Sequence, residues 1–316
     1  LLLCYNRLLG QYIAEKVKEF GVESYTMHSY LTMLAGVKNI TKKDDTGFWE
    51  NELPVLAMDK MLESGEYIGY FDEIIIDEAQ DILRDNYLDV IDLSLKGGLA
   101  AGKWRFFGDF ENQAIYKAAD VSIHQLLRER VGEVPIFHLR VNCRNTPRVA
   151  TMAEILGGLN PEYKKVLRPD DGIDVEIVFY RTYEEQQDAL IGLLEKLYKE
   201  GFEGHNIVIL SPKINGCAST LSMEPWCSRL RNYNHMSKGY IGISTIQAFK
   251  GLEAPVIIIT DIERLYTEED QSLLYIGITR SLWRVYILIN KIVEKNYYDL
   301  IIKNAMKMGG RVLCNE

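Results

Sequence analysis

The most constraining feature of the chain is a run of three isoleucines, Ile74 to Ile76, which ends at Asp77 and Glu78. A short β-branched run that follows an aromatic residue favours a strand over a helix. A strand that is apolar on both faces is typical of a buried parallel sheet. The two acids then lie at the carboxyl end of that strand, where open α/β sheets bind ligands. The sequence therefore predicts an α/β fold with a polar site directly after Ile76.

The two acids suit different tasks in such a site. Asp77 offers the hard carboxylate oxygens that Mg²⁺ prefers. Glu78, one residue further, could polarise a water molecule for attack on a phosphate. The alternative is a strand that ends in a polar turn, with Asp77 as a helix cap. The pair by itself leaves both interpretations open.

Length, charge and cysteine content restrict the class of protein. A chain of 316 residues predicts about two domains, and 47% hydrophobic with 26% charged residues is an ordinary globular composition. The net charge of −9 argues against a protein that coats nucleic acid non-specifically, although a narrow basic groove is compatible with it. The five cysteines include no C-x-x-C pair, which indicates reduced thiols, a cytoplasmic location and no structural zinc. No apolar run approaches the roughly 18 residues of a membrane span.

The segment from Asp77 to Asp81, DEAQD, resembles the Mg²⁺-binding motif of the UvrD/Rep family of superfamily 1 DNA helicases. The resemblance implies that Asp77 holds Mg²⁺ and that Glu78 activates water. Further segments resemble motifs of the same family in the family's order, and they cover nearly the whole chain. These segments are residues 1–13, 25–29, 108–116, 138–145, 240–261 and 273–281.

Three residues near the start of the chain match DNA-contacting positions of the family. Tyr5 and Asn6 follow a predicted strand, and His28 matches the histidine of the family's T-F-H-S element. The resemblance implies that all three touch single-stranded DNA. The alternatives are a core tyrosine at a strand end and a structural histidine, both of which are common.

A predicted strand at residues 104–107 leads into a segment similar to the family's G-D-x-x-Q-x-I-Y motif, with one extra residue before the glutamine. The resemblance places Asp109 at the nucleotide and makes Gln113 the sensor of the γ-phosphate, since an amide can both donate and accept. Tyr116 would stack on a base, an interaction worth about 1–3 kcal/mol. The tryptophan that the family usually adds just afterwards is absent.

Two arginines match family positions that act on phosphate. Arg144 lies in a segment similar to L-x-x-N-Y-R-S, and the resemblance implies contact with the γ-phosphate; without that context a surface ion-pair residue would be the favoured interpretation. Cys143 stands where the family has a tyrosine that stacks on adenine. Arg280 matches an arginine finger in L-L-Y-V-G-x-T-R-A, which can contribute about 10³–10⁵ in rate.

Residues 240–261 are similar to the family's S-T-I-H-x-x-K-G-L-E-A-P-V motif, with Gln247 in place of the histidine. The resemblance implies a nucleotide contact at Gly251 and a hydrogen bond from Glu253 to the ribose. A helix beginning near Ala248 would add N–H donors for phosphate. A plain strand–turn–strand is the alternative. The residues expected to contact nucleic acid here are Ser244, Thr245, Gln247 and Lys250.

One apparent phosphate loop does not fit. Gly97 to Lys103 reads GGLAAGK and matches G-x-x-x-x-G-K, but Trp104 follows where Ser or Thr should reach Mg²⁺. The segment also follows a predicted helix at residues 86–95 and precedes a strand, which is the reverse of a phosphate loop. No other lysine can be assigned to the phosphates. We expect the family's phosphate loop to precede residue 1 in a longer protein, and this piece to hydrolyse ATP negligibly.

The predicted architecture is two tandem RecA-like parallel-sheet domains with small or absent accessory insertions. Residues 1–132 would form the first, N-terminally truncated domain and residues 133–316 the second. ATP with Mg²⁺ would bind between them, and single-stranded DNA would run across both, with movement from 3′ to 5′ as in the family. Residues 38–51 are expected to be a surface loop or a short insertion, residues 174–210 a β-α-β unit, residues 211–238 irregular, and the tail after residue 291 helical.

The leading hypothesis is therefore an ATP-dependent helicase or translocase. A catalytically silent module that binds nucleic acid or protein is the alternative, but it gives no physical reason for the complete set of matched residues. A motor fused to a nuclease or defence system is a third possibility, on which nothing in the sequence bears.

Overall fold

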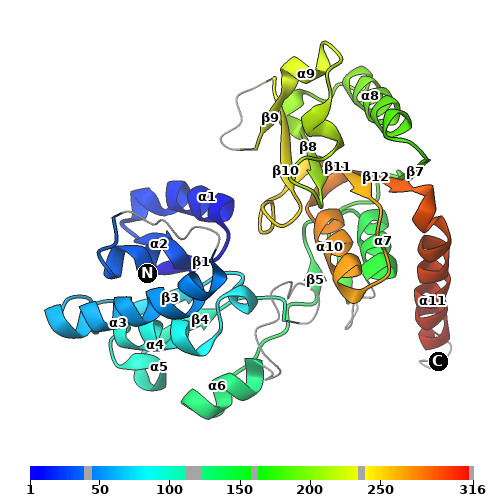
Figure 1. Cartoon of the computed structure of the whole chain (residues 1–316). Helices are drawn as coiled ribbons and strands as arrows, with labels where there is room; N and C mark the ends of the chain where they lie inside the picture. Colours follow the sequence, from blue (N-terminus) through cyan, green and yellow to red (C-terminus); the bar gives the residue numbers. More distant parts are fainter. Residues whose placement is uncertain (39–44, 111–122, 158–162, 234–238, 313–316) are drawn as a thin grey trace. The chain divides into compact units, whose positions relative to one another are not determined.

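The computed structural model describes residues 1–38, 45–110, 123–157, 163–233 and 239–312 (Figure 1). The chain divides into two compact units, Leu1–Phe137 and His138–Glu316. The expected domain limit was residue 132. Within the described ranges, no helix is both long enough and apolar enough to cross a membrane.

The first unit contains a four-stranded sheet in the order β2-β1-β3-β4, in which every described pairing is parallel. The strand predicted from the isoleucine run is β3, with Ile74 and Ile76 fully buried. Because β3 lies between β1 and β4, both of its edges are hydrogen-bonded, as expected for a buried apolar strand. The strands are β1 (Leu2–Cys4), β2 (Ser24–Thr26), β3 (Glu73–Ile76) and β4 (Lys103–Phe106).

The helices of this unit pack on the sheet and on one another. Asn6 begins α1, because its side-chain oxygen accepts hydrogen bonds from the N–H groups of Leu8 and Leu9. Helix α3 packs against α2 and α4, and a buried hydrogen bond of 2.7 Å from Tyr30 to Ser94 joins α2 to α4. The helices are α1 (Arg7–Val17), α2 (Met27–Leu34), α3 (Leu53–Ser64), α4 (Asp85–Ser94), α5 (Gly98–Ala101) and α6 (Ile123–Val131).

The expectation of a surface loop at residues 38–51 is partly wrong, and residues 39–44 lie outside the described residues. Residues Phe48–Glu52 form a single π-helical turn, η2, that leads into α3. Phe48 is buried and Trp49 is half-buried against the core of the unit. Two adjacent aromatic residues in a polar stretch were the signal for this contact, because burying their rings is favourable enough to order a short segment.

The second unit contains a six-stranded parallel sheet in the order β7-β12-β11-β8-β10-β9. Strand β11 is buried along all of its length except the half-buried Pro255, which explains its nearly continuous apolar sequence. The strands are β7 (Glu176–Tyr180), β8 (Ile207–Ser211), β9 (Leu230–Asn232), β10 (Ile241–Thr245), β11 (Ala254–Ile262) and β12 (Ser281–Asn290). The prediction of an α/β fold with two parallel sheets is confirmed.

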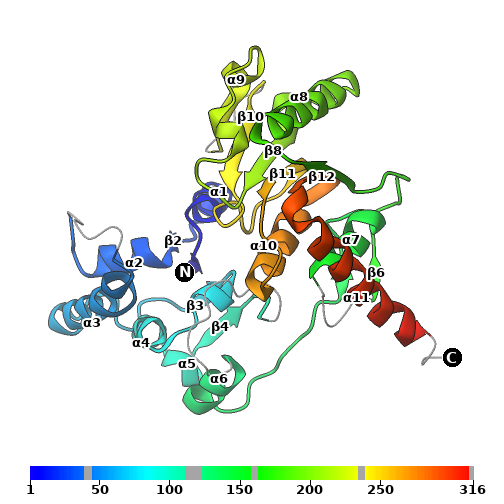
Figure 2. The same cartoon turned by 45° about the vertical axis from the view of Figure 1, so that its right-hand side comes forward.

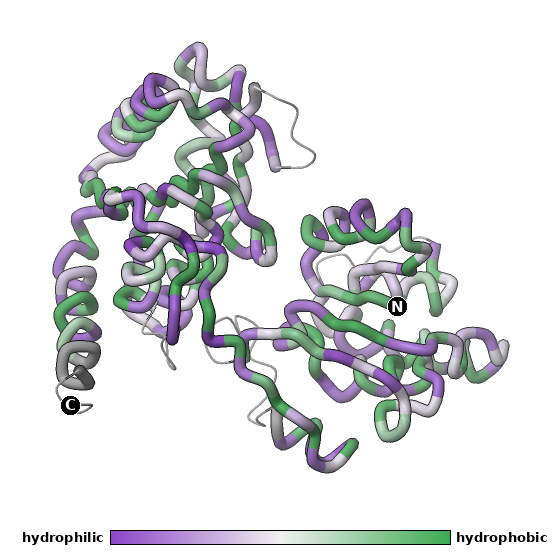
Figure 3. Tube along the Cα trace, turned by 180° about the vertical axis from the view of Figure 1, so that it is seen from behind, coloured by the Kyte–Doolittle hydropathy of each residue, from purple (hydrophilic) through white to green (hydrophobic). Residues whose placement is uncertain are grey.

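Helices cover both faces of this sheet (Figure 2). The leucine stripe of α8 (Tyr183–Lys199) packs with Ile207, Ile209 and Ile258, and the alternation of hydrophobic and hydrophilic residues along α8 is visible in Figure 3. Helix α10 (Glu268–Thr279) covers the other face, where a Cβ at Gly277 would lie 2.9 Å from the Ile259 side chain. Helix α10 packs on α7 (Pro147–Gly157), and α7 packs on α11 (Glu294–Val312).

One expectation for this unit is confirmed and another needs correction. Strands β7 and β8 are parallel members of one sheet joined by α8, as predicted, and β12 and β11 lie between them. The stretch at residues 211–238 is not wholly irregular. It contains the short helices η5 (Cys217–Thr220) and α9 (Trp226–Arg229), followed by the edge strand β9. Short edge elements carry little periodicity, which is why the pattern did not reveal them.

Candidate functional site

The paired acids lie at the carboxyl end of β3, as predicted. The Asp77 N–H donates to the Leu3 carbonyl at 2.9 Å, so Asp77 is anchored to β1. Its Oδ1 accepts from the Glu78 N–H at 3.0 Å, which fixes the direction of the carboxylate. Glu78 adopts a left-handed backbone conformation with φ of 52°. Such a conformation is uncommon for a residue other than glycine and occurs often at functional sites.

Gln80 connects the acid pair to the end of the neighbouring strand β4. Its Nε2 donates to Glu78 Oε2 at 2.6 Å, and its Oε1 accepts from the Asp109 N–H at 3.1 Å. A Cβ at Gly108 would lie 2.5 Å from that same Oε1, so only glycine allows the close approach. Gln80 was not predicted as a site residue, although it lies within the DEAQD segment.

The acid pair affects the electrostatics of β1. Burial, with the negative charges of Asp77 and Glu78, raises the pKa of the Cys4 thiol to about 12, so this cysteine stays protonated. A divalent cation would be favoured at the same place. Mg²⁺ commonly takes one or two protein carboxylates and completes its shell with water and phosphate oxygens, which fits the half-buried Asp77. Among the described residues there is no group of three or more potential metal ligands.

The predicted phosphate sensor and the base-stacking tyrosine, Gln113 and Tyr116, lie outside the described residues. Asp109 is described and half-buried, and Gln80 links it to the acid pair. The rejected phosphate loop has no phosphate-binding form, because Lys103 is the first residue of β4 and pairs with Glu73 of β3. Its glycines instead surround the short helix α5.

The expected DNA contacts Tyr5 and His28 are brought together at the carboxyl ends of β1 and β2. Their ring centroids are 5.0 Å apart, and His28 Nε2 lies 3.0 Å from the Tyr87 hydroxyl. Burial, with a smaller contribution from Arg84, lowers the pKa of His28 to about 4, so its imidazole is neutral near pH 7. The Asn6 side chain is used as the cap of α1. Trp49 packs on His28 with centroids 4.8 Å apart and was missed as a candidate.

In the second unit, two predicted nucleotide-binding residues contact each other across 109 positions of sequence. Arg144 Nε donates to Glu253 Oε2 at 2.8 Å, and both side chains are substantially exposed, at 36% and 49%. Arg144 follows β5 (Val141–Asn142), where the Asn142 side chain accepts from its N–H at 3.0 Å. An exposed arginine–carboxylate pair of this kind is weak, so both groups could exchange their contact for one to a nucleotide.

The predicted DNA-contact motif connects β10 to β11. Ser244 and Thr245 end β10 and are half-buried, and the Thr245 hydroxyl accepts from the Ala248 N–H at 3.1 Å. Residues 246–251 form turns, so the helix expected near Ala248 is not present. Gln247 is half-buried within these turns, and Gly251 closes them with φ of 85°, a conformation that favours glycine.

Two predicted cationic residues are buried. Lys250 is 2% exposed, and Arg280 is 1% exposed at the end of α10. Arg280 Nε donates to the Ile276 carbonyl at 3.1 Å, and its Nη2 donates to Thr279 Oγ1 at 3.2 Å. Burial of a guanidinium is costly unless it is hydrogen-bonded, so these contacts make Arg280 part of the core of its unit.

A buried acid at the carboxyl ends of β8 and β11 was not predicted. Asp261 is 3% exposed and has φ of 62°. Its Oδ2 accepts from Ser211 at 2.8 Å, from Thr260 at 2.7 Å and from the Cys217 N–H at 3.0 Å. The apolar run before Asp261 predicts a strand, and no periodic signal in the sequence reveals a buried acid near the end of that strand. Asp261 joins the ends of two strands to η5.

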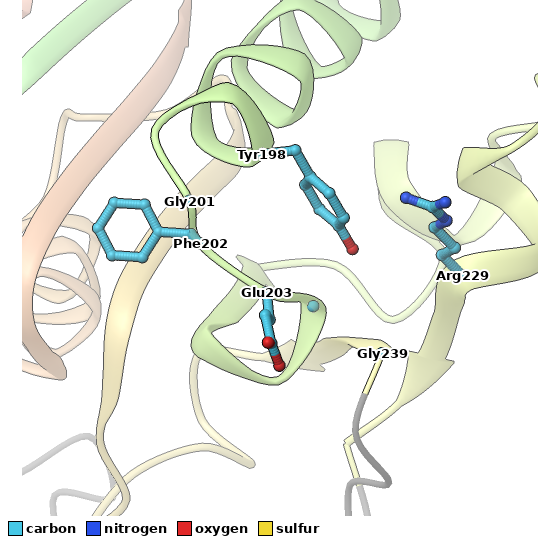
Figure 4. Close-up of a pocket in the computed structure, with 7 residues that line it drawn as sticks. Tyr198, Gly201, Phe202, Glu203, Arg229 and Gly239 are labelled. Atoms are coloured by element: carbon cyan, nitrogen blue, oxygen red, sulfur yellow. The ribbon is translucent and has the colours of Figure 1, made fainter.

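The second unit also contains an open cavity of about 420 Å³ (Figure 4). The Arg229 guanidinium lies 5.0 Å from the Tyr198 ring and 5.5 Å from the Trp226 ring. Gly204 and Gly239 lie just before β8 and β10, so the cavity is at the amino ends of these strands and contains no predicted site residue. It is lined by Tyr198, Gly201, Phe202, Glu203, Gly204, Arg229 and Gly239.

Three solved structures that are similar to this chain are described as helicases. The arterivirus nonstructural protein 10 helicase is 15% identical, with 91% of this chain and 52% of that chain covered and a TM-score of 0.41. The C-terminal domain of a possible DNA helicase from Lactobacillus plantarum is 16% identical, with 47% and 87% covered and a TM-score of 0.36. The PRRSV helicase is 11% identical, with 69% and 34% covered and a TM-score of 0.37. This chain therefore spans about half the length of the arterivirus helicase.

Since these TM-scores all lie below 0.5, the family assignment rests on sequence. None of the curated proteins compared with the chain matches it. Residues 240–288 match the model of the UvrD-like helicase C-terminal domain. The matched range contains the β10–β11 motif, helix α10 and most of β12. The predicted resemblance is thereby confirmed: residues 240–288 are similar to the UvrD-like helicase C-terminal domain.

Proposed function

We propose that the chain is the motor part of an ATP-dependent DNA helicase or translocase of the UvrD/Rep type, which moves 3′ to 5′ on single-stranded DNA in the cytoplasm. The observation that supports this most strongly is the family match at residues 240–288, because it contains Ser244, Thr245, Gln247, Lys250, Glu253 and Arg280. The proposal extends to any longer protein that contains this sequence.

The first unit would supply the metal and the water. Asp77 would hold Mg²⁺, which neutralises charge on the phosphates when it is bound. Glu78, held by Gln80 at 2.6 Å, would accept a proton from the attacking water. Asp109 is linked to the same glutamine, so a change at the nucleotide can be passed to the end of β4. Gln113 would sense the γ-phosphate.

The second unit would supply the positive charge and the grip on the nucleotide. Arg144 would leave Glu253 for the γ-phosphate, which frees the Glu253 carboxylate to accept from a ribose hydroxyl. Arg280 would stabilise charge on the transferred phosphoryl group, a task that requires it to leave its contacts with Ile276 and Thr279. Ser244 and Thr245 would contact the DNA backbone at the end of β10.

ATP turnover with and without single-stranded DNA tests this proposal. We expect the protein encoded by the complete gene to hydrolyse ATP with Mg²⁺, and an oligo(dT) strand to accelerate turnover at least tenfold. This chain alone is expected to turn over ATP negligibly, since it contains no G-x-x-x-x-G-K-[ST] segment. An inert complete protein that still binds the oligonucleotide would instead support the silent binding module.

A further inference from the structure

Three aromatic side chains gather where β1 and β2 end in the first unit. The His28 ring lies 5.0 Å from the Tyr5 ring at an interplanar angle of 64°, and 4.8 Å from the Trp49 ring at 36°. Tyr5, His28 and Trp49 are all half-buried. We call these three residues the aromatic cluster. They come from three separate segments, so it is the fold that places them together.

The segments beneath the cluster hold it in place. The Tyr87 hydroxyl donates to the Trp49 carbonyl at 3.2 Å and lies 3.0 Å from His28 Nε2, so one residue of α4 contacts both the Trp49 backbone and the His28 ring. Phe48 packs edge-on against Trp49, with centroids 5.4 Å apart, and is itself buried. A rigid, partly exposed tryptophan is a low-entropy binding surface, because little side-chain freedom remains to be lost.

The charges around the cluster favour a flat, uncharged ligand. His28 is neutral near pH 7 because its surroundings lower its pKa to about 4. Arg84 lies over the Tyr87 ring at 5.0 Å and forms an ion pair with Glu50. The cluster thus presents ring faces and no uncompensated charge, whereas phosphate recognition depends on available cations. Every nucleobase has a π-face that can stack on such rings.

We propose that the aromatic cluster is a base-stacking site for single-stranded DNA and that Trp49 supplies its main face. The proposal rests on the proposed function, and it adds a residue that no helicase motif in the sequence includes. Tyr5 supports the base from the side of β1. His28 is a positioning residue that keeps the Trp49 ring oriented through their stacking contact.

Oligonucleotides with and without bases test the proposal on this chain. Binding of dT12 is compared with binding of a twelve-unit strand of abasic sites, for the native chain, Trp49→Leu and Trp49→Phe. Leucine keeps apolar volume against Phe48 but removes the aromatic face, and phenylalanine keeps a smaller face. We expect Trp49→Leu to weaken dT12 binding by about five- to a hundredfold, with Trp49→Phe intermediate. Abasic-strand affinity and the salt dependence of binding should be unchanged.

Tyr70→Leu is the matched control. Tyr70 is 59% exposed, packs on Tyr67 and Phe71, and precedes β3 at the other end of the strand from the acid pair. This substitution should leave dT12 affinity unchanged. A second measurement uses a chain in which Trp104, Trp226 and Trp283 are replaced by Phe, so that Trp49 is the remaining tryptophan. Its fluorescence should be quenched by dT12 and not by the abasic strand.

Every outcome of these binding and fluorescence experiments either supports or overturns the stacking site. Equal losses for dT12 and the abasic strand, or no loss in folded Trp49→Leu, would overturn the stacking site while leaving DNA binding intact. A native chain that binds neither strand would overturn both this inference and the proposed function. Should Trp49→Leu fail to fold, unquenched Trp49 fluorescence in a chain that binds dT12 would overturn the stacking site, and quenching would support it.

Discussion

The motif residues of the two units differ in how deeply they are buried. In the first unit, Asp77 and Glu78 are half-buried and are oriented by backbone N–H groups and by Gln80. In the second, Lys250 and Arg280 are 2% and 1% exposed. A match to a motif therefore says which residue type is present, whereas burial decides whether that residue also stabilises its unit. Substitution of an acid in the first unit should therefore lower turnover alone, whereas substitution of the buried Arg280 in the second should lower stability as well.

The largest effect is expected for Glu78→Gln. Loss of a general base typically lowers a rate by about 10²–10⁴-fold, and we expect a decrease in ATP turnover of that size in the complete protein. The free energy of unfolding should change by less than about 0.5 kcal/mol, since an amide can still accept from Gln80. Asp72→Asn is the control, because Asp72 is exposed at the other end of β3 and pairs with Lys96. Equal turnover in the two variants would remove Glu78 from the chemistry.

Arg280→Ala is expected to lower stability as well as turnover. It removes two hydrogen bonds from a buried guanidinium and leaves a void, so the free energy of unfolding should fall by about 3 kcal/mol in chemical denaturation. Arg264→Ala provides the comparison, because Arg264 is 72% exposed and lies 3.8 Å from Asp270. That change should cost less than about 0.5 kcal/mol. If the Arg280→Ala chain were as stable as the native one, burial of Arg280 would contribute nothing to the free energy of unfolding.

Titration of His28 is expected to make the free energy of unfolding of the first unit depend on pH. Its native pKa of about 4 is below its usual value of 6.5, so the unfolded chain takes up the proton first as the pH falls. This group therefore destabilises the fold progressively between about pH 6.5 and pH 4, by at most about 1.4 kcal/mol per pH unit. His28→Gln should show a smaller loss of stability over that window in urea titrations at several pH values. Parallel curves for the two chains would contradict the burial of a neutral histidine.

The smallest effect is expected for the ion pair of Arg144 and Glu253. Both side chains are more than a third exposed, so a double-mutant cycle with Arg144→Gln and Glu253→Gln should give a coupling energy below about 1 kcal/mol. The measurement is the free energy of unfolding of the four chains without nucleotide. A coupling of about 2 kcal/mol or more would mean that the pair is structural, which would weaken its assignment to nucleotide binding.

Sequence predicted those elements whose residues have one dominant pattern. The isoleucine run predicted β3, the leucine stripe predicted α8, and the apolar stretch after Glu253 predicted β11. The acid pair was placed correctly at the end of its strand, since a strand fixes the direction of the residues directly after it. The contact of Arg144 with Glu253 could not be predicted, because it joins segments 109 residues apart. A motif lists residues, and only the fold determines which of them meet.

The misses have physical causes of their own. Trp49 lies in a polar stretch whose composition indicates a loop, and its burial depends on Phe48 and on the distant Tyr87. Asp261 lies near the end of a long buried strand, and nothing in its own segment shows that Ser211 and the Cys217 N–H donate hydrogen bonds to it. In both cases long-range packing outweighs the local preference.

The most direct test of the motor function is strand displacement by the complete protein. A short duplex with a 3′ single-stranded tail and the same duplex with a 5′ tail are each mixed with the protein, ATP and Mg²⁺, and release of the shorter strand is followed. We expect release from the 3′-tailed duplex alone, and none without ATP or with Glu78→Gln. Release from the 5′-tailed duplex would contradict the direction, and no release from either duplex would contradict the helicase activity itself.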